Sequence, residues 1–321
     1  MKTTYLITGG AGNLASQLTH ELGVPGEQIV LFDTTGQPSV PVASGCRFVR
    51  GDVTSRQEIR EVLESTRPDT ILHMASLLSG SSEQDLPRAW NVNLHSTMMI
   101  LETMVELDIE RILFPSSVAT YGGMLPDRLP EDHPQWPTTF YGFTKLACER
   151  LGVYFHDQHG VDFRALRLPI VLSAYTPPGA ASAYASRAFI DAVRTGGYTF
   201  RVAPSSRAAC VYIKDALCAL TGLLQAPVSN LTRQVYNIHA LAPSAEEIRT
   251  TVVDHVAGAD IKFEPEPSMV ALVEGWPAAI DDQAARNDWN WTPSYNLDRL
   301  ADAFVADLQT VSPAKAASNT R

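Results

Sequence analysis

Tyr141 and Lys145 stand four residues apart in the string YGFTK, 24 residues after Ser117, and these three side chains could carry out one reaction. Four residues make about one turn of an α-helix, so the phenol and the ammonium would project from one helix face. A free phenol has a pKa of about 10, and a nearby cation favours its charged form. A phenolate can take a proton from an alcohol, which is the task of a general base in alcohol oxidation. The spacing therefore predicts a Tyr–Lys general-base pair, with Ser117 placed to hydrogen-bond the reacting oxygen.

A cofactor site is predicted at the N-terminus. Residues 3–8 (TTYLIT) have the character of a short buried strand, the string TGGAGNLA follows at residues 8–15, and an amphipathic segment comes next. Strand, glycine-rich turn and helix form the setting of a dinucleotide fingerprint. The helix N-terminus would offer free N–H groups and a positive dipole end to phosphates. The alternative is a glycine-rich turn without a ligand. The expected contacts come from Gly9, Gly12, Asn13 and Leu14.

Asp33 indicates which dinucleotide would bind. It ends the next apolar run, QIVLFD, 21 residues after Gly12, close to the spacing of a ribose-binding acid. Its carboxylate can accept hydrogen bonds from both ribose hydroxyls and would repel a 2′-phosphate. The residues that follow are TTG rather than arginine. The sequence therefore predicts NAD and not NADP. A solvated loop aspartate is the alternative, but it does not account for the position.

The composition indicates what kind of protein this is and which kinds of binding partner are excluded. The chain has 321 residues, of which 45% are hydrophobic and 19% charged, as expected for a soluble globular protein. A net charge of −10 argues against nucleic acid or an anionic membrane as a partner. The longest apolar runs have the length of strands, so neither a signal peptide nor a membrane span is expected.

The cysteines and histidines point to no metal centre. The four cysteines are far apart in the sequence and form no metal or redox motif, so reduced, packed thiols in a cytoplasmic protein are expected. His156 and His159 lie three residues apart on an expected helix, but the sequence shows no third ligand, and no metal is expected.

Strands and helices alternate as a parallel α/β sheet requires, which predicts a Rossmann-type doubly wound fold. Further strands are expected at residues 46–53, 70–76, 111–117 and 161–169, and helices near residues 56–65, 87–107 and 141–159. The alternation weakens after about residue 170. We therefore expect an NAD-binding domain at 1–170, a smaller, mainly substrate-binding lobe at 171–311, and a disordered tail at 312–321. A late strand near 235–239 would return to the sheet.

In such a sheet the ligand lies over the carboxyl ends of the strands. Asp52 and Val53 could meet the adenine there, and other residues at or after the strand ends would line the rest of the cofactor. The expected set, besides the glycine turn and Asp33, is Asp52, Val53, Ala75, Ser76, Leu77, Ser116, Leu168 and Pro169.

The strings TGGAGNLA, PSSVATYG and YGFTK together resemble the extended short-chain dehydrogenases/reductases of the sugar-nucleotide epimerase type. The resemblance covers nearly the whole chain. It implies Ser117, Tyr141 and Lys145 as the catalytic set, with Lys145 also holding the nicotinamide ribose. It further implies that Asn93 is a structural and relay residue beside the cofactor, and that the protein is a homodimer, with a monomer left open.

A narrower resemblance lies outside these shared motifs. LLSGSSE, AWNVN, GGYTF, YNIHALAPSAEEI and GWPAAIDDQAARNDWNW are similar to the short-chain type of L-threonine 3-dehydrogenase. This resemblance implies a pocket for a small amino acid. One loop departs from the family's pattern, PGGGTTDYA, and has PPGAASAYA at residues 177–185, where Ser182 can replace one threonine hydroxyl. The implied pocket residues are Ser79, Ser117, Tyr141, Gly179, Ser182 and Trp276.

The implied reaction is oxidation of the 3-hydroxyl of L-threonine to 2-amino-3-oxobutanoate, with hydride passing from C3 to NAD. Three alternatives stay open. LRLP followed by AASAYAS is similar to dehydrogenases of four-carbon sugar acids such as erythronate. A sugar-nucleotide epimerase or dehydratase would use the same Tyr–Lys pair but needs a diphosphate clamp, and no basic one is evident. A non-catalytic NAD sensor commonly lacks the tyrosine or the lysine, and both are present here.

Overall fold

A computed structural model describes residues 3–23, 27–38, 40–176 and 180–310. Gly179, expected in the substrate pocket, and the tail expected at 312–321 lie outside the described residues. Seven parallel strands form the central sheet in the order β11-β7-β5-β4-β1-β2-β3. The order reverses beside β1, and ligands of open α/β sheets bind at such a switch point. The strands are β1 (Thr4–Thr8), β2 (Gln28–Asp33), β3 (Arg47–Arg50), β4 (Thr70–His73), β5 (Arg111–Ser117), β7 (Asp162–Leu168) and β11 (Val235–Asn237).

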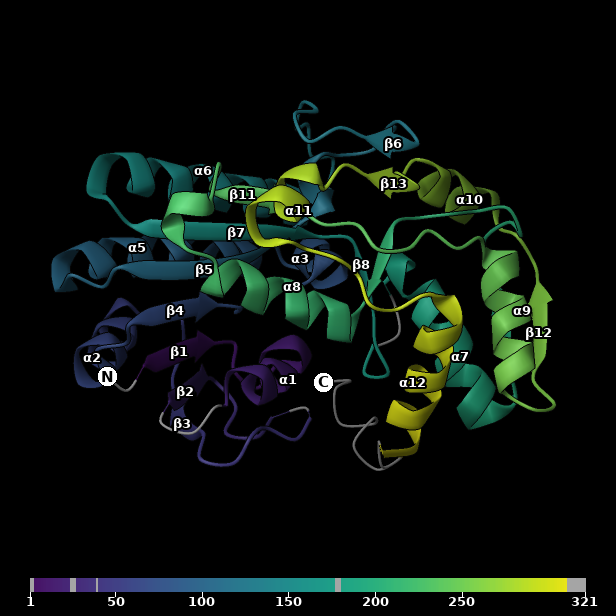
Figure 1. The fold of residues 1–321 in the computed structure, drawn as a ribbon, viewed down its shortest axis with the longest axis horizontal. Helices are drawn as coiled ribbons and strands as arrows, with labels where there is room; N and C mark the ends of the chain where they lie inside the picture. The colour runs from purple at the N-terminus through teal and green to yellow at the C-terminus, as the bar shows by residue number, and fades with distance from the viewer. Residues whose placement is uncertain (1–2, 24–26, 39, 177–179, 311–321) are drawn as a thin grey trace.

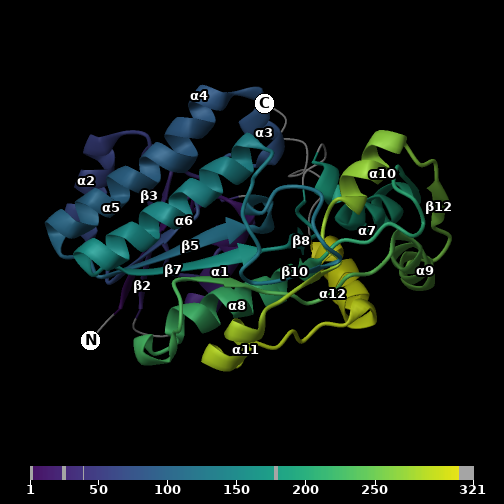
Figure 2. The ribbon, with the colours of Figure 1, turned by 90° about the horizontal axis from the view of Figure 1, so that it is seen from above.

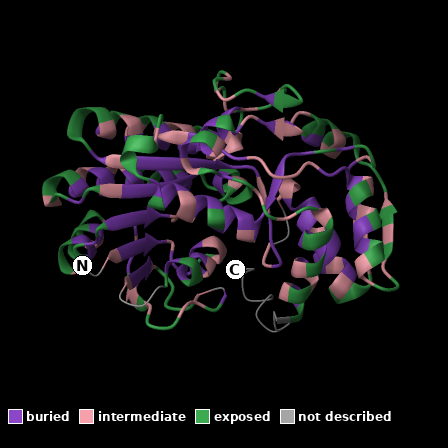
Figure 3. Cartoon of the chain, viewed as in Figure 1, coloured by how far each residue is buried: buried purple, intermediate pink, exposed green. Residues whose placement is uncertain are grey.

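Helices cover both faces of this sheet (Figures 1 and 2). One face carries α2 (Arg56–Thr66), α5 (Ser96–Leu107) and α6 (Phe140–His159). The other carries α1 (Asn13–Leu22), α8 (Ile213–Gln225) and α11 (Gln283–Trp289). The strands between them are mostly buried, as Figure 3 shows, because apolar side chains on both of their faces meet a helix layer. The α/β class with a doubly wound parallel sheet, expected from the sequence, is confirmed.

A second group of elements gathers at the carboxyl ends of the strands (Figures 1 and 2). It contains three pairs of short parallel strands. They are β8 (Ile170–Leu172) with β10 (Cys210–Tyr212), β9 (Gly197–Phe200) with β12 (Asp260–Phe263), and β6 (Arg128–Leu129) with β13 (Ala279–Ile280). Its helices are α7 (Tyr184–Thr195), α9 (Ala245–His255), α10 (Pro267–Glu274) and α12 (Leu297–Thr310).

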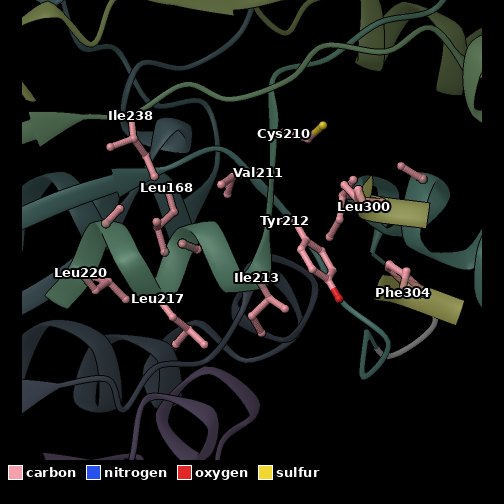
Figure 4. Packing of buried hydrophobic residues seen from close by; sticks show 14 of the residues in the cluster. Leu168, Cys210, Val211, Tyr212, Ile213, Leu217, Leu220, Ile238, Leu300 and Phe304 are labelled. Atoms are coloured by element: carbon pink, nitrogen blue, oxygen red, sulfur yellow. The ribbon is translucent and has the colours of Figure 1, made fainter. Parts of the chain in front are cut away.

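One apolar cluster joins the sheet to this second group. It runs from Ile7 of β1 to Phe304 of α12. Figure 4 shows Leu168 at the end of β7 close to the side chains of α8, with Tyr212 turned toward α12. Because buried apolar area is the main stabilising term in folding, this shared cluster fixes the second group over the strand ends.

Three strands are shorter than the sequence indicates. β3 stops at Arg50, and Asp52 lies in a turn in which its carboxylate accepts from the backbone N–H of Thr54 at 2.8 Å. β4 stops at His73, because the backbone then turns toward the glycine loop and Ala75 N–H donates to the Thr8 hydroxyl at 3.3 Å. Pro169 interrupts the strand expected over 161–169, since proline has no N–H for the ladder.

The helix expected over 87–107 is broken into three parts. α4 (Leu86–Ala89) leads into a π-helical turn at Trp90–His95 and then into α5. Side chains satisfy the carbonyls of this turn: Ser96 Oγ donates to Val92 O at 2.5 Å, and Thr97 Oγ1 donates to Asn93 O at 2.8 Å. Single π-turns are frequent at functional sites. The remaining short helices are α3 (Ser79–Gln84) and the 3₁₀ turns Val118–Thr120, Ala181–Ala183 and Val228–Asn230.

Among the helices in the described ranges, none is long and apolar enough to cross a membrane.

Gly152 of α6 sets the distance between that helix and the sheet. A Cβ at this position would lie 2.1 Å from Cε2 of the buried Phe163 ring. We expect Gly152→Ala to lower the free energy of unfolding by about 1–3 kcal/mol, the usual cost of overpacking a core. Urea denaturation measures this change.

Gly80 in α3 provides the matched control, because a Cβ there would meet no atom within 4 Å. Gly80→Ala should leave the stability unchanged or raise it by up to about 1 kcal/mol. Equal effects of the two substitutions would show that α6 does not pack this closely.

Candidate active site

The glycine turn has the shape of a phosphate cradle. Gly9 has a left-handed φ of +65°, and a Cβ there would lie 2.7 Å from the backbone of Ala75. Only glycine fits both conditions. Gly12 is the N-cap of α1, where no side chain caps the helix and no acidic residue lies in the first turn. The N–H groups of this helix end, at Asn13 and Leu14, are therefore suited to an anion such as a pyrophosphate.

Asp33 lies beside this turn at the end of β2. One carboxylate oxygen accepts from Ala11 N–H at 3.1 Å, and the other accepts from Thr35 N–H at 2.9 Å. The carboxylate is partly exposed and keeps acceptor capacity for the hydroxyls of a ribose. Asp33 pairs with Arg50 in the sheet, so Asp52 and the buried Val53 come just after the end of the neighbouring strand, on the side expected for an adenine.

Asn93 holds the segment after β4. Its side-chain amide accepts from Leu77 N–H at 2.7 Å and donates to Leu77 O at 3.1 Å, so it satisfies both backbone groups of that residue. It also donates to Thr144 Oγ1 of α6 at 3.2 Å. Asn93 is buried, so it supports from behind the segment Ala75–Leu77, which is expected to line the cofactor.

The predicted catalytic residues come together on α6 and β5. Thr139 caps α6 by accepting from Gly142 N–H at 3.1 Å, and this start turns Tyr141 and Lys145 toward the strand. Lys145 Nζ donates to Pro115 O at 2.9 Å and lies 5.8 Å from the centre of the Tyr141 ring. A hydrogen bond links Ser117 to the Tyr141 phenol. The general-base triad predicted from spacing is thus assembled at one strand end.

The electrostatics of the triad differ from the sequence expectation. Burial raises the pKa of Tyr141 to about 12, and the hydrogen bond from Ser117 lowers it only in part. Burial also lowers the pKa of Lys145 to about 8, against the opposing effects of Cys148 and Glu149. The sequence predicted that Lys145 keeps the phenol acidic, whereas the pKa of Tyr141 is raised. Desolvation outweighs the effects that favour ionisation, so the neutral form of the phenol is favoured.

Two buried titratable residues at the site were missed by sequence reasoning. Glu149 of α6 accepts from Ser116 Oγ at 2.5 Å and forms an ion pair with Arg167 at 2.7 Å. His73 at the end of β4 shares hydrogen bonds with Thr8 Oγ1 at 2.7 Å and Thr97 Oγ1 at 3.1 Å, and burial lowers its pKa to about 3. One signal was available for Glu149, because Tyr141, Lys145 and Glu149 share a spacing of four residues.

The predicted substrate residues that the structure describes come from three segments. Ser79 opens α3, whose Glu83 accepts from the N–H of Phe140 at 2.7 Å, directly before Tyr141. Ser182 lies in the 3₁₀ turn Ala181–Ala183. Trp276 is half-buried after α10, and the preceding Gly275 accepts from Leu125 N–H at 3.2 Å, in the loop that follows the Ser117 turn.

The glycine turn is linked to the segment that precedes the altered loop. Asn13 Nδ2 donates to Ser173 Oγ at 3.0 Å, and Ser173 is buried four residues before the loop at residues 177–185. Leu168 and Pro169 lie at the end of β7, directly before β8.

In the described ranges, no group of three His, Cys, Asp or Glu side chains is placed to hold a metal ion. His156 Nδ1 is bound to Val161 O at 2.9 Å, and the His159 ring packs 5.1 Å from that of Phe155.

Comparison with known proteins gives consistent results. The model of the NAD dependent epimerase/dehydratase family matches residues 5–238. The mitochondrial L-threonine 3-dehydrogenase of Bos taurus is 32% identical over 306 residues, which is 94% of this chain and 81% of that protein. The structure of L-threonine dehydrogenase from Clostridium difficile aligns with a TM-score of 0.89 and 31% identity, covering 96% of this chain and 98% of the other. The holo form of the GalE-like L-threonine dehydrogenase from Cupriavidus necator aligns with a TM-score of 0.86 and 31% identity, covering 95% of this chain and 99% of the other.

Proposed function

The chain belongs to the NAD-dependent epimerase/dehydratase family, and we propose that within this family it oxidises the 3-hydroxyl of L-threonine to 2-amino-3-oxobutanoate with NAD. The observation that carries this proposal is the meeting of Ser117, Tyr141 and Lys145 at a strand end beside a glycine-rich phosphate cradle. The similarity to several L-threonine dehydrogenases supports the choice of substrate.

The residues present fit NAD. The cradle at Gly9–Leu14 would hold the pyrophosphate, and Asp33 would accept the hydroxyls of the adenosine ribose. Asp52 and Val53 would face the adenine, and Lys145 would hold the nicotinamide ribose. When bound, the oxidised cofactor supplies the hydride acceptor and a positive charge. The other residues proposed to line it are Ala75, Ser76, Leu77, Ser116, Leu168 and Pro169, with Asn93 supporting Leu77.

The protein's own part in the reaction is proton transfer and positioning. Tyr141 would take the proton of the 3-hydroxyl, while Ser117 would hydrogen-bond the same oxygen as it becomes a ketone. Burial opposes ionisation of Tyr141, whose pKa of about 12 leaves little phenolate at neutral pH. The ammonium of Lys145 is the nearby cation of this chain that favours the phenolate. Ser79, Gly179, Ser182 and Trp276 would hold the substrate's carboxylate and ammonium.

A four-carbon sugar acid such as erythronate is the second candidate substrate. In the described end of the altered loop, Ser182 lies between Ala181 and Ala183, where the threonine-specific pattern has a second threonine and an aspartate. An aspartate would pair with the ammonium of an amino acid, and a sugar acid has no such group.

The first test is the formation of NADH with L-threonine, L-allo-threonine, erythronate and UDP-galactose offered separately. We expect turnover with L-threonine, and Tyr141→Phe should reduce kcat by about 10²–10⁴-fold because the general base is lost. Tyr141→Phe should still bind NADH. Turnover of erythronate without threonine would overturn the substrate assignment, and full activity of Tyr141→Phe would overturn the catalytic one.

The choice of NAD over NADP rests on Asp33. We expect Asp33→Ala to lower kcat/KM for NAD by about 10–100-fold, because a charge-assisted hydrogen bond contributes about 1.5–3 kcal/mol. The discrimination against NADP should fall as well, since the negative charge that repels a 2′-phosphate is gone. Steady-state kinetics with both cofactors give these ratios.

Asp69→Asn is the control for this measurement. The Asp69 carboxylate accepts from Thr4 N–H at 2.7 Å, at the opposite end of the strands from Asp33. This variant should keep the wild-type preference for NAD. If Asp33→Ala also keeps it, Asp33 is not the ribose-binding residue.

We further propose that the protein is a homodimer formed through the outer face of α6 and the π-helical turn. Trp90 and Phe143 are 45% and 40% exposed there, and their rings stack 6.3 Å apart. Tyr154, on the same helix, is 55% exposed. Exposed aromatic clusters of this kind mark protein interfaces, and a second copy of this chain is the partner that the family resemblance implies.

Light scattering after gel filtration tests this assembly. The wild-type protein should have the mass of a dimer, and Trp90→Glu combined with Phe143→Glu should give a monomer because two charges would be buried in the interface. Val228→Glu is the control, since Val228 is 60% exposed in the turn that follows α8, on the other face of the sheet. A monomeric wild-type protein would refute the proposal.

The cysteines support a reducing compartment, which we propose to be the cytoplasm. All four thiols are free. Cys148 and Cys210 are buried and Cys46 is half-buried, but Cys218 is exposed, so the expectation that all four are packed is wrong for this residue.

A further inference from the structure

Three successive turns of α6 are bound to three successive residues of β5. Tyr141 is hydrogen-bonded to Ser117, Lys145 donates to Pro115 O at 2.9 Å, and Glu149 accepts from Ser116 Oγ at 2.5 Å. A spacing of four residues puts the three helical side chains on one face. The position of Tyr141 and Lys145 along the strand is therefore fixed together with that of Glu149.

Glu149 is fully buried, and both of its oxygens are occupied. Oε1 accepts from Ser116 Oγ and from Arg167 Nε at 2.9 Å. Oε2 accepts from Arg167 Nη2 at 2.7 Å and from Gln135 Nε2 at 3.2 Å. The exposed fraction is 0% for Glu149 and 7% for Arg167. A buried carboxylate with a bidentate arginine and two further donors has one well-defined position.

Arg167 extends this network to the second group of elements. Its remaining nitrogen donates to the Tyr121 hydroxyl at 2.6 Å, and that hydroxyl donates to Asn237 Oδ1 at 3.1 Å. Asn237 in turn donates to Asp281 O at 3.3 Å, in the segment that follows Trp276. A continuous buried chain of hydrogen bonds thus joins the helix of the general base to the segment proposed to line the substrate pocket.

We propose that Glu149, paired with Arg167, is the positioning residue of this active site: it fixes Lys145 and Tyr141 against β5 and supplies the negative charge that keeps Lys145 protonated. The inference rests on the proposed oxidation and adds a residue that touches neither substrate nor cofactor.

The charges around Lys145 support this role. The titratable groups that the structure places near it are Tyr141, Cys148 and Glu149 on its own helix and His73 on β4. Burial keeps His73 neutral, with a pKa of about 3, and raises the pKa of the Cys148 thiol to about 11. Glu149, whose two oxygens accept from Arg167, is the acidic partner in this set. It raises the pKa of Lys145, which burial has lowered to about 8.

The pH dependence of the activity follows from the direction in which Glu149 changes the pKa of Lys145. In the complex with NAD, where the positive charge of the cofactor would favour the phenolate form of Tyr141, Lys145 must stay protonated, so activity falls as pH rises through the pKa of Lys145. Without the charge of Glu149 that pKa falls further, and the alkaline limb of the kcat/KM profile moves to lower pH. We expect Glu149→Gln to shift this limb downward by about one pH unit. We also expect kcat to fall by about 10–100-fold, because the general base is no longer held in register.

A second variant separates this effect from a failure to fold. Glu149→Gln leaves Arg167 buried without its counter-charge and could unfold the protein. The double variant Glu149→Met/Arg167→Met removes both charges, while Tyr121 and Asn237 keep each other as partners. It should have a melting temperature close to that of the wild type and still show the downward shift, because the carboxylate that raises the pKa of Lys145 is gone.

Asp162 provides the matched control at the opposite end of β7. Its carboxylate pairs with the buried Arg164 at 2.8 Å and with Arg111 at 2.6 Å. Asp162→Asn should lower the melting temperature but leave the alkaline limb in place. If the Glu149 variants lose stability in the same way with no shift of the limb, Glu149 is only structural and the inference is overturned.

One readout does not depend on the substrate. The affinity for NADH, followed by fluorescence as a function of pH, reports on Lys145 because that residue is proposed to hold the nicotinamide ribose. In the Glu149 variants affinity should be lost at lower pH than in the wild type and in Asp162→Asn. A wild-type protein that oxidises none of the offered alcohols would refute the proposed reaction, whereas an unshifted NADH profile would refute the role of Glu149.

Discussion

The packing of α6 against β5 is the constraint on which the site depends. Gly142 would bring a Cβ within 2.3 Å of Ala119 O, and Gly152 would bring one within 2.1 Å of the Phe163 ring, so the helix lies as close to the sheet as its backbone allows. At this distance no water separates the layers, and each polar group on the inner face of α6 needs a protein partner. The partners of Lys145 and Glu149 are consecutive residues of β5. Helix position and chemical geometry are thus set by the same contacts.

The burial that fixes this geometry also disfavours the charged forms of the side chains proposed to react. Desolvation raises the pKa of Tyr141 and lowers that of Lys145, and both shifts favour the uncharged forms. A phenol in its neutral form is not a base that takes a proton from an alcohol. Additional positive charge nearby would favour its ionisation. In the proposed reaction, NAD held by Lys145 and the glycine turn would supply that charge, so ionisation of Tyr141 would be coupled to cofactor binding.

Local sequence patterns predicted the parts of the fold that depend on local chemistry. The strand at Arg111–Ser117 has the predicted bounds, and the glycine turn lies where its spacing placed it. The strand ends after Arg50 and His73 were missed because side-chain hydrogen bonds from Asp52 and Thr8 compete with the ladder. Tertiary burial explains the other errors. Glu149 has the sequence pattern of a solvated helix residue, but β7 places Arg167 against it. The pKa of Tyr141 depends on its burial in the fold and on Ser117, 24 residues away in the sequence.

The strand of the central sheet that comes last in the sequence, β11, has a consequence for folding during synthesis. Val235 of β11 pairs with Ala165 of β7, seventy residues earlier in the sequence. At 5–20 residues per second, a ribosome needs roughly 4–14 s to add that stretch. During this time β7 is an open sheet edge, and Arg167 and Tyr121 lack Asn237. The unpaired backbone groups of an exposed strand edge can form hydrogen bonds with a strand of another chain. The central sheet therefore cannot be completed until β11 has been synthesised.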